Sequence, residues 1–149
     1  MGFDKISLKG RALRLLASRE HSRAELQKKL AAHEQEPGEL QRALDDLQAK
    51  GFISEQRVVE SVIHRRAARL GAGRVKQELQ AKGVSAEAIA EAVDRLRGSE
   101  TERAREVWRK KFGEPAADPA GRARQMRFLA ARGFGAEAIR RVVRGADDD

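Results

Sequence analysis

Apolar residues recur along this chain at the three- and four-residue spacing of helices that bury one face. Near the start, Ala12, Leu15 and Leu16 share one face, and further on Leu40 and Leu44 share another. No stretch alternates apolar and polar residues as a half-buried strand does. The pattern therefore predicts an all-α protein built from short helices that each present an apolar stripe to a core.

The apolar pattern repeats about every fifty residues. The segment 82–89 (KGVSAEAI) returns as 132–139 (RGFGAEAI), and a shift of 49 residues carries the leucines of 26–47 onto apolar positions of the next segment. Gly83 and Gly133 each follow an apolar-periodic segment, where a residue that tolerates positive φ ends a helix. The chain thus contains three copies of one helical unit.

The first copy departs from the other two at the turn. It keeps the apolar positions but has Glu34 and Gln35 where the others have glycine followed by an apolar residue. The predicted organisation is a lead-in over 1–9, repeats over 10–51, 52–97 and 98–145, and an acidic tail over 146–149.

Polar residues mark several helix starts. Ser22 with Glu25 forms a capping box, in which side chains satisfy free backbone N–H groups, and the segment 99–102 predicts a second one. Asp118 can cap the helix that Pro119 opens. These signals place the repeats on helices that begin at defined residues.

Composition limits the size of the cores and the cellular setting. Of 149 residues, 36% are charged and 4% are aromatic, which predicts thin aliphatic cores. A fifty-residue unit is marginal alone, so neighbouring units are expected to share contacts. The chain has no cysteine, which excludes disulfides and thiolate metal sites, and no long apolar run. We expect a soluble, cytoplasmic protein that does not enter a membrane.

Residues with catalytic or ligand-binding chemistry do not form a recognisable site. The histidines His21, His33 and His64 lie in different repeats, and the serines lack a nucleophile motif. The segment 71–73 (GAG) lacks the third glycine and the preceding strand of a dinucleotide site. We therefore expect no enzyme activity, no metal, no cofactor and no small-molecule substrate.

The charge distribution favours an anionic partner. Net charge is +8, and residues 98–145 carry twelve basic and six acidic residues. Solubility alone is the plainer interpretation, and the helix dipole explains individual cations late in a helix. Clustering supports a binding role for the group. The candidate partner- or nucleic-acid-binding residues are Arg65, Arg66, Arg69, Arg74, Lys76, Arg109, Lys110, Lys111, Arg122, Arg124, Arg127, Arg132, Arg140 and Arg141.

A helix-turn-helix regulator is the main alternative. The segment 78–85 followed by Ile89 looks like the turn of that motif. The helix after it, however, carries Glu87, Glu91 and Asp94 outward, which suits a phosphate-lined groove poorly. A helical scaffold for another acidic protein remains a third possibility.

Five short motifs follow one another along the chain in a specific order: 21–26 (HSRAEL), 51–53 (GFI), 74–84 (RVKQELQAKGV), 109–113 (RKKFG) and 127–134 (RFLAARGF). With this order and spacing, the chain resembles the RecX family, bacterial proteins that regulate the RecA recombinase. The resemblance extends through nearly the whole chain.

The resemblance implies an elongated, curved rod of three tandem three-helix repeats without catalysis of its own. It further implies a monomer that lies in the groove of the RecA filament on single-stranded DNA. Such proteins inhibit filament extension, ATP hydrolysis, strand exchange and the co-protease activity behind the SOS response. Some family members also bind DNA.

Overall fold

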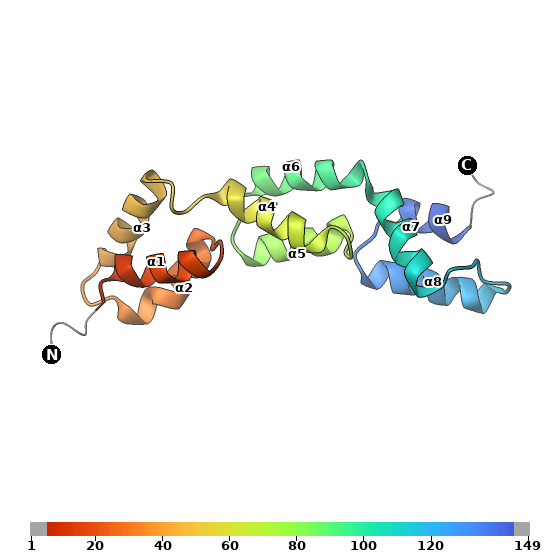
Figure 1. The fold of residues 1–149 in the computed structure, drawn as a ribbon, viewed down its shortest axis with the longest axis horizontal. Helices are drawn as coiled ribbons and strands as arrows, with labels where there is room; N and C mark the ends of the chain where they lie inside the picture. The colour runs from red at the N-terminus through yellow and green to blue at the C-terminus, as the bar shows by residue number, and fades with distance from the viewer. Residues whose placement is uncertain (1–5, 145–149) are drawn as a thin grey trace.

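The computed structural model describes residues 6–144. Over these residues, nine α-helices and one short 3-10 helix form three bundles that follow one another in a row (Figure 1). The predicted all-α fold of three tandem three-helix repeats is confirmed. The predicted acidic tail 146–149 and most of the predicted lead-in 1–9 lie outside the described residues.

Each repeat contains three consecutive helices. Repeat 1 comprises α1 (Leu8–Ser18), α2 (Arg23–Leu30), the 3-10 turn η2 (Ala31–His33) and α3 (Glu39–Ala49). Repeat 2 comprises α4 (Glu55–Arg66), α5 (Ala72–Ala81) and α6 (Ala86–Arg97). Repeat 3 comprises α7 (Glu100–Lys111), α8 (Pro119–Ala131) and α9 (Ala136–Val143). Within residues 6–144, none of these helices is long and apolar enough to cross a membrane.

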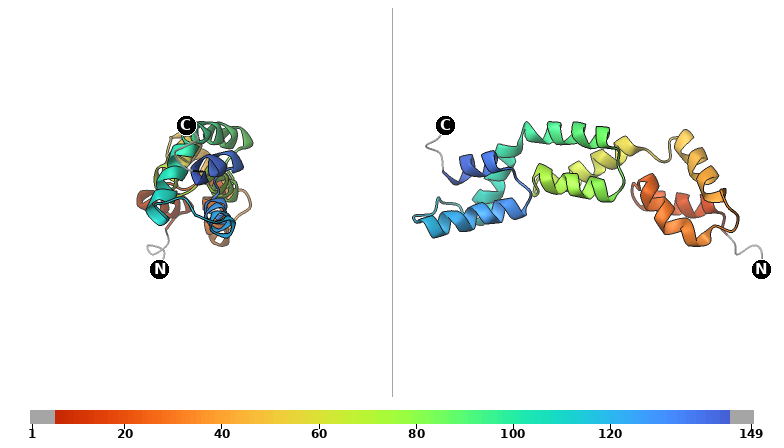
Figure 2. Two further views of the ribbon diagram at one scale, coloured as in Figure 1. Left: turned by 90° about the vertical axis from the view of Figure 1, so that its right-hand side faces the viewer. Right: turned by 180° about the vertical axis from the view of Figure 1, so that it is seen from behind.

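The row of bundles is elongated and shallowly arched. In Figure 1, α1 and α2 of repeat 1 and α8 of repeat 3 lie lower than α6 of repeat 2. Seen end-on in Figure 2, the three bundles overlap within a narrow outline, and the reverse view shows the same row from behind. The arrangement spreads surface side chains along a rod.

Each repeat has its own small core. Leu26 and Leu44 are fully buried in repeat 1, Val62 and Leu79 in repeat 2, and Leu129 in repeat 3. Trp108 also belongs to the core of repeat 3, and the partly buried Phe112 packs against it. Because each core is thin, contacts between repeats matter for stability.

Most predicted helix caps are present, and one is not. Ser22 and Glu25 form the predicted capping box, and Asp118 caps α8 with Pro119 in the first turn. The prediction of a second capping box at 99–102 is wrong. The Ser99 hydroxyl instead donates to the carbonyl of Leu96, so it does not cap the amides of α7.

The N-terminus of the second helix of a repeat contacts the turn between the second and third helices of the next repeat. The Ser22 hydroxyl donates to the carbonyl of Lys82 at 2.6 Å. At the equivalent place one repeat later, the Gly71 N–H donates to the carbonyl of Arg132 at 2.8 Å. The next residue of each turn, Gly83 or Gly133, has positive φ, 75° and 89° respectively. The glycine turns are therefore both helix ends and contact surfaces.

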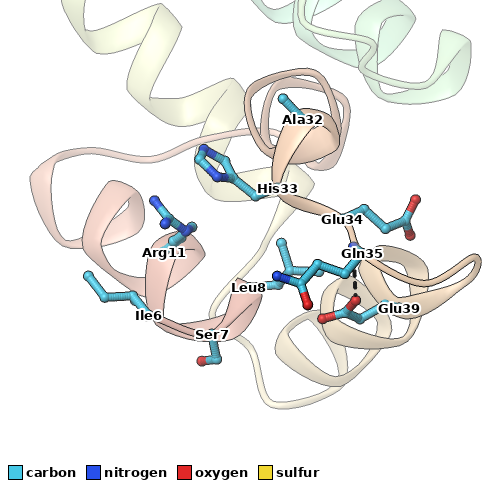
Figure 3. Close-up of a pocket in the computed structure, with 9 residues that line it drawn as sticks. All are labelled: Ile6, Ser7, Leu8, Arg11, Ala32, His33, Glu34, Gln35 and Glu39. Atoms are coloured by element: carbon cyan, nitrogen blue, oxygen red, sulfur yellow. Dashed lines mark hydrogen bonds between the residues drawn. The ribbon is translucent and has the colours of Figure 1, made fainter. Parts of the chain in front are cut away.

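The second helix of repeat 3 and the turn of repeat 1 do not make this contact between repeats within residues 6–144. Gly121 is the repeat 3 equivalent of Gly71, but α8 begins earlier and the Gly121 N–H donates to the Asp118 carboxylate at 2.7 Å. At the other end, Glu34 replaces the glycine and has a φ of −72°. A pocket of about 390 Å³ lies beside this turn, where Arg11 and His33 project toward each other (Figure 3).

Candidate partner interface

Four of the fourteen candidate cations are paired with carboxylates. Arg65 and Arg66 both contact Glu78, at 3.3 and 3.0 Å. Arg109 pairs with Glu106 at 3.0 Å and Arg141 with Glu137 at 2.9 Å. Ion pairs at the surface contribute little to stability, but a paired cation is partly neutralised and so attracts an external anion less strongly.

Arg74 has a role between repeats. Its guanidinium donates to the carbonyl of Ala131 in repeat 3 at 2.8 Å. Its backbone also lies against the glycine turn, since a Cβ on Gly133 would come within 2.5 Å of the Arg74 nitrogen. Arg74 therefore holds repeats 2 and 3 together.

The other candidates have no carboxylate partner among the described residues. Seven have neither an ion pair nor a side-chain hydrogen bond there: Arg69, Lys76, Lys110, Arg122, Arg124, Arg127 and Arg140. The remaining two, Lys111 and Arg132, lie against an aromatic ring.

That ring is Phe128 of α8. The Lys111 ammonium lies 5.6 Å from the ring centroid, and the Arg132 guanidinium carbon lies 4.9 Å from it. Phe112 packs edge-on against the same ring with centroids 5.3 Å apart, which anchors it to the end of α7. Phe128 thus holds cations from two segments in one place.

Arg124 extends this group along α8. Residues four apart lie on the same face of a helix, so Arg124, Phe128 and Arg132 form one row. We call the group Lys111, Arg124, Phe128 and Arg132 the α8 seam. No acidic residue occurs from Pro119 to Ala136. Positive charge in the seam is therefore uncompensated by its own helix.

The helices that follow the glycine turns differ in sign. In repeat 2, α6 exposes Glu87, Glu91 and Asp94, whereas in repeat 3, α9 exposes Arg140 and Arg141. Only the last repeat could present a basic helix to a phosphate-lined groove.

Sequence reasoning groups the cations by proximity along the chain and misses Phe128. It places Arg109, Lys110 and Lys111 together, yet the helix turns Arg109 toward Glu106 and Lys111 toward Phe128. The spacing of Arg124, Phe128 and Arg132 at four-residue intervals is the signal that identifies the row.

Models of a known family match all three repeats in order. The first, second and third three-helix domains of RecX match residues 9–47, 54–93 and 99–143. The regulatory protein RecX of Leptothrix cholodnii is 56% identical over 145 residues, covering 97% of this chain and 92% of that protein. That of Ralstonia nicotianae is 46% identical, covering 95% of this chain and 89% of that protein.

Solved structures share the fold. A crystal structure of regulatory protein RecX superposes with a TM-score of 0.77 at 19% identity, covering 91% of this chain and 70% of that one. RecX from Lactobacillus salivarius superposes with a TM-score of 0.76 at 16% identity, covering 92% of both chains. Three matched domains in tandem, together with this identity to curated relatives, show that the chain belongs to the RecX family of regulatory proteins.

Proposed function

We propose that this protein is a non-enzymatic negative modulator of RecA that acts in the cytoplasm as a monomer. It binds in the groove of the RecA–single-stranded DNA filament and inhibits filament extension, ATP hydrolysis, strand exchange and co-protease activity. The observation that carries the proposal is the match of all three repeats, in order, to the three RecX domains.

The shape supports such a role. Unpaired cations lie along more than one repeat, with Arg69 and Lys76 in repeat 2 and the α8 seam in repeat 3. A rod can place such groups against several subunits of a larger winding assembly at once. Several weak contacts made together give an avidity that no single repeat would have.

The junction between repeats 2 and 3 supports this geometry further. Two backbone hydrogen bonds cross it, from Gly71 to Arg132 at 2.8 Å and from Gly73 to Gly133 at 3.0 Å. A junction made through the backbone keeps the cations of the two repeats at a fixed spacing, which lowers the entropy lost on binding.

The test is a titration of RecA filaments preformed on poly(dT), with ATP hydrolysis as the readout. We expect the hydrolysis rate to fall as this protein is added, at less than one molecule per RecA. An unchanged rate up to stoichiometric amounts would overturn the proposal. A salt-resistant preference for one duplex sequence over random duplex would instead support the operator-binding alternative.

The candidate cations on α7 can be tested in the same assay. Reversing charge at Arg109, Lys110 and Lys111 together should weaken inhibition while helical content is retained, because these residues lie exposed on the helix surface. Full inhibition by that variant would remove this cluster from the proposed interface.

A further inference from the structure

We propose that the α8 seam binds the phosphodiester backbone of single-stranded DNA directly. The inference deepens the proposed function, because it assigns this surface to the nucleic acid of the filament and not to the RecA protein. It rests on the contacts of Lys111, Arg124, Phe128 and Arg132.

The first step concerns how the cations are held. Lys111 and Arg132 lie 5.6 and 4.9 Å from the centroid of the Phe128 ring. An aromatic ring attracts a cation without carrying a formal charge, so it fixes the position of the group and leaves its charge available. A carboxylate in the same place would fix the cation but cancel its charge. The seam is thus preorganised for an external anion.

The second step concerns spacing. Residues four apart in a helix are displaced by about 6 Å along its axis. Arg124 and Arg132 therefore lie about 12 Å apart along the axis, with Phe128 and the Lys111 ammonium that it holds between them. Successive phosphates along an extended strand repeat at an interval comparable to one four-residue step. Two of the three cations are arginines, whose planar guanidinium donates two parallel hydrogen bonds to phosphate. The row therefore suits a chain of phosphates.

The third step separates DNA from an acidic protein as the ligand. Protein interfaces draw most of their binding energy from a few aromatic and arginine side chains that fill well-packed, desolvated pockets. Among the described residues, the large apolar side chains that are exposed are Leu13, Phe52 and Met126. Met126 belongs to α8 but lies two residues from both Arg124 and Phe128, which places it on the opposite side of the helix. Phe128 at the centre of the seam is half-buried and lies beneath Lys111 and Arg132, so the seam presents mainly charge to a partner.

The test measures binding of a fluorescent thirty-nucleotide oligo(dT) by anisotropy, without RecA, across a range of salt concentrations. The variant is Lys111→Gln/Arg124→Gln/Arg132→Gln. Each lost phosphate contact reduces the magnitude of the negative slope of log K against log salt by about 0.7 for a single strand. We expect this magnitude to fall by about 2 and the affinity at 0.1 M salt to fall about a hundredfold. An unchanged slope and affinity would overturn the inference.

A matched variant controls for net charge. Lys9, Lys50 and Arg95 are paired with carboxylates in repeats 1 and 2. The variant Lys9→Gln/Lys50→Gln/Arg95→Gln removes the same three charges, and we expect its affinity for oligo(dT) to change less than fivefold. An equal loss in both variants would show that only the overall field matters and would overturn the assignment.

Folding is controlled with a milder variant. Arg132 is half-buried and its carbonyl accepts a hydrogen bond from Gly71, so its replacement could disturb the junction. The pair Lys111→Gln/Arg124→Gln changes exposed side chains only, and it should lose about 25-fold in affinity at 0.1 M salt. Circular dichroism melting should show the same Tm as the wild-type protein. Loss of binding only where the Tm also falls would contradict the inference.

A carboxylate probe distinguishes phosphate from acidic protein. Polyglutamate should bind the wild-type protein and the seam variant with similar affinity, whereas oligo(dT) should discriminate between them. Equal losses for the two probes would overturn the choice of DNA.

The failure of the proposed function can be told apart from the failure of this inference. If the wild-type protein fails to inhibit RecA but the seam variant loses affinity for oligo(dT), the proposed function is wrong and the assignment of the seam to DNA is supported. If RecA is inhibited and the seam variant binds oligo(dT) normally, only the seam assignment fails.

Discussion

Gly71 of repeat 2 and Gly133 of repeat 3 lie so close that no side chain fits between them. A Cβ on Gly71 would come within 2.4 Å of the Gly133 carbonyl carbon. In this space the Gly71 N–H bonds the carbonyl of Arg132, and the Gly73 N–H bonds that of Gly133. Two repeats are thereby joined backbone to backbone, a contact that only glycine permits at this position.

Replacing Gly71 with alanine should separate repeats 2 and 3 or strain the backbone there. Overpacking of this kind costs about 1–3 kcal/mol, so we expect urea denaturation to show a free energy of unfolding lower by this amount. Gly98→Ala is the matched control, since its Cβ would lie 3.5 Å from its nearest neighbour and its φ is −60°. Its stability should be unchanged or slightly higher. Equal effects of the two substitutions would contradict the role of the close approach.

Arg103→Lys should also weaken the junction. The Arg103 guanidinium donates to the carbonyls of Ala67, Leu70 and Leu96 at 2.8 to 2.9 Å. Burial lowers its pKa, and Glu100 only partly offsets this. Lysine has one ammonium in place of the planar fork and cannot satisfy all three carbonyls, so we expect a loss of about 2 kcal/mol in the free energy of unfolding.

The control for this substitution is Arg105→Lys on the same helix, because the Arg105 guanidinium has no hydrogen-bond or ion-pair partner within residues 6–144. Urea titration of both variants should show the loss only for Arg103. A loss of similar size at Arg105 would point to helix propensity and not to the carbonyl cluster.

Glu25 should make the junction between repeats 1 and 2 sensitive to acid. Burial raises its pKa, but the Ser22 N–H, Arg19 and Lys82 outweigh this and lower the pKa to about 2. A depressed carboxyl pKa contributes stability above the unfolded value of 4.5, and the contribution is lost as pH falls from there toward 2. Glu25→Gln should therefore cost about 1–2 kcal/mol at pH 7.

The measurement is the Tm of the wild-type and Glu25→Gln proteins between pH 7 and pH 2.5. The gap between them should be constant down to about pH 5 and then narrow as the pH falls toward the folded-state pKa. A gap that stays constant to pH 2.5 would show that the Glu25 carboxyl titrates normally in the folded protein.

The two junctions should differ in stiffness. Repeats 1 and 2 are linked through side chains, with Lys82 pairing with Glu25 at 3.4 Å and Arg57 with Glu20 at 2.8 Å. Repeats 2 and 3 are linked through the backbone as well. Links between partly exposed side chains open more readily than backbone pairs between packed segments. Repeat 1 should therefore swing more than repeat 3 relative to repeat 2.

Spin labels can measure this difference, because the chain has no native cysteine to interfere. Lys28, Gln77 and Arg127 are exposed and occupy equivalent positions in the three repeats. Labels introduced at 28 and 77 should give a broader distance distribution than labels at 77 and 127. Equal widths would contradict the proposed difference in stiffness.

The sequence predicts the repeats well because each helix carries its own signals. The apolar spacing of Leu26 and Leu30 and the capping box at Ser22 depend only on residues within a few positions. Both are therefore found in the folded protein as the sequence predicts. Gly83 and Gly133 are also predicted correctly as helix ends, since positive φ is a local demand. Fold class therefore follows from the sequence alone.

Contacts between repeats are not predicted in the same way. The absence of glycine at Glu34 has no explanation in local terms, because a helix can end without one. The structure gives the reason that the later turns need glycine. Gly83 packs against Ala24 of the preceding repeat, and a Cβ on Gly83 would come within 2.7 Å of the Ala24 Cβ. Likewise, the Glu100 carboxylate accepts a hydrogen bond from the N–H of Ala72 across the junction at 2.9 Å, which the local sequence around Glu100 does not indicate. Such pairings depend on distant segments.

The helical turn that α8 adds before Gly121 limits head-to-tail association between molecules. Head-to-tail contacts that use unlike surfaces grow into open fibres unless something stops them. Here the Gly121 N–H, equivalent to the Gly71 N–H that contacts the next repeat, donates to the Asp118 carboxylate, and Glu34 stands in place of the turn glycine in repeat 1. The protein should therefore sediment as a monomer even in concentrated solution. Asp118→Ala should free the Gly121 N–H and promote self-association.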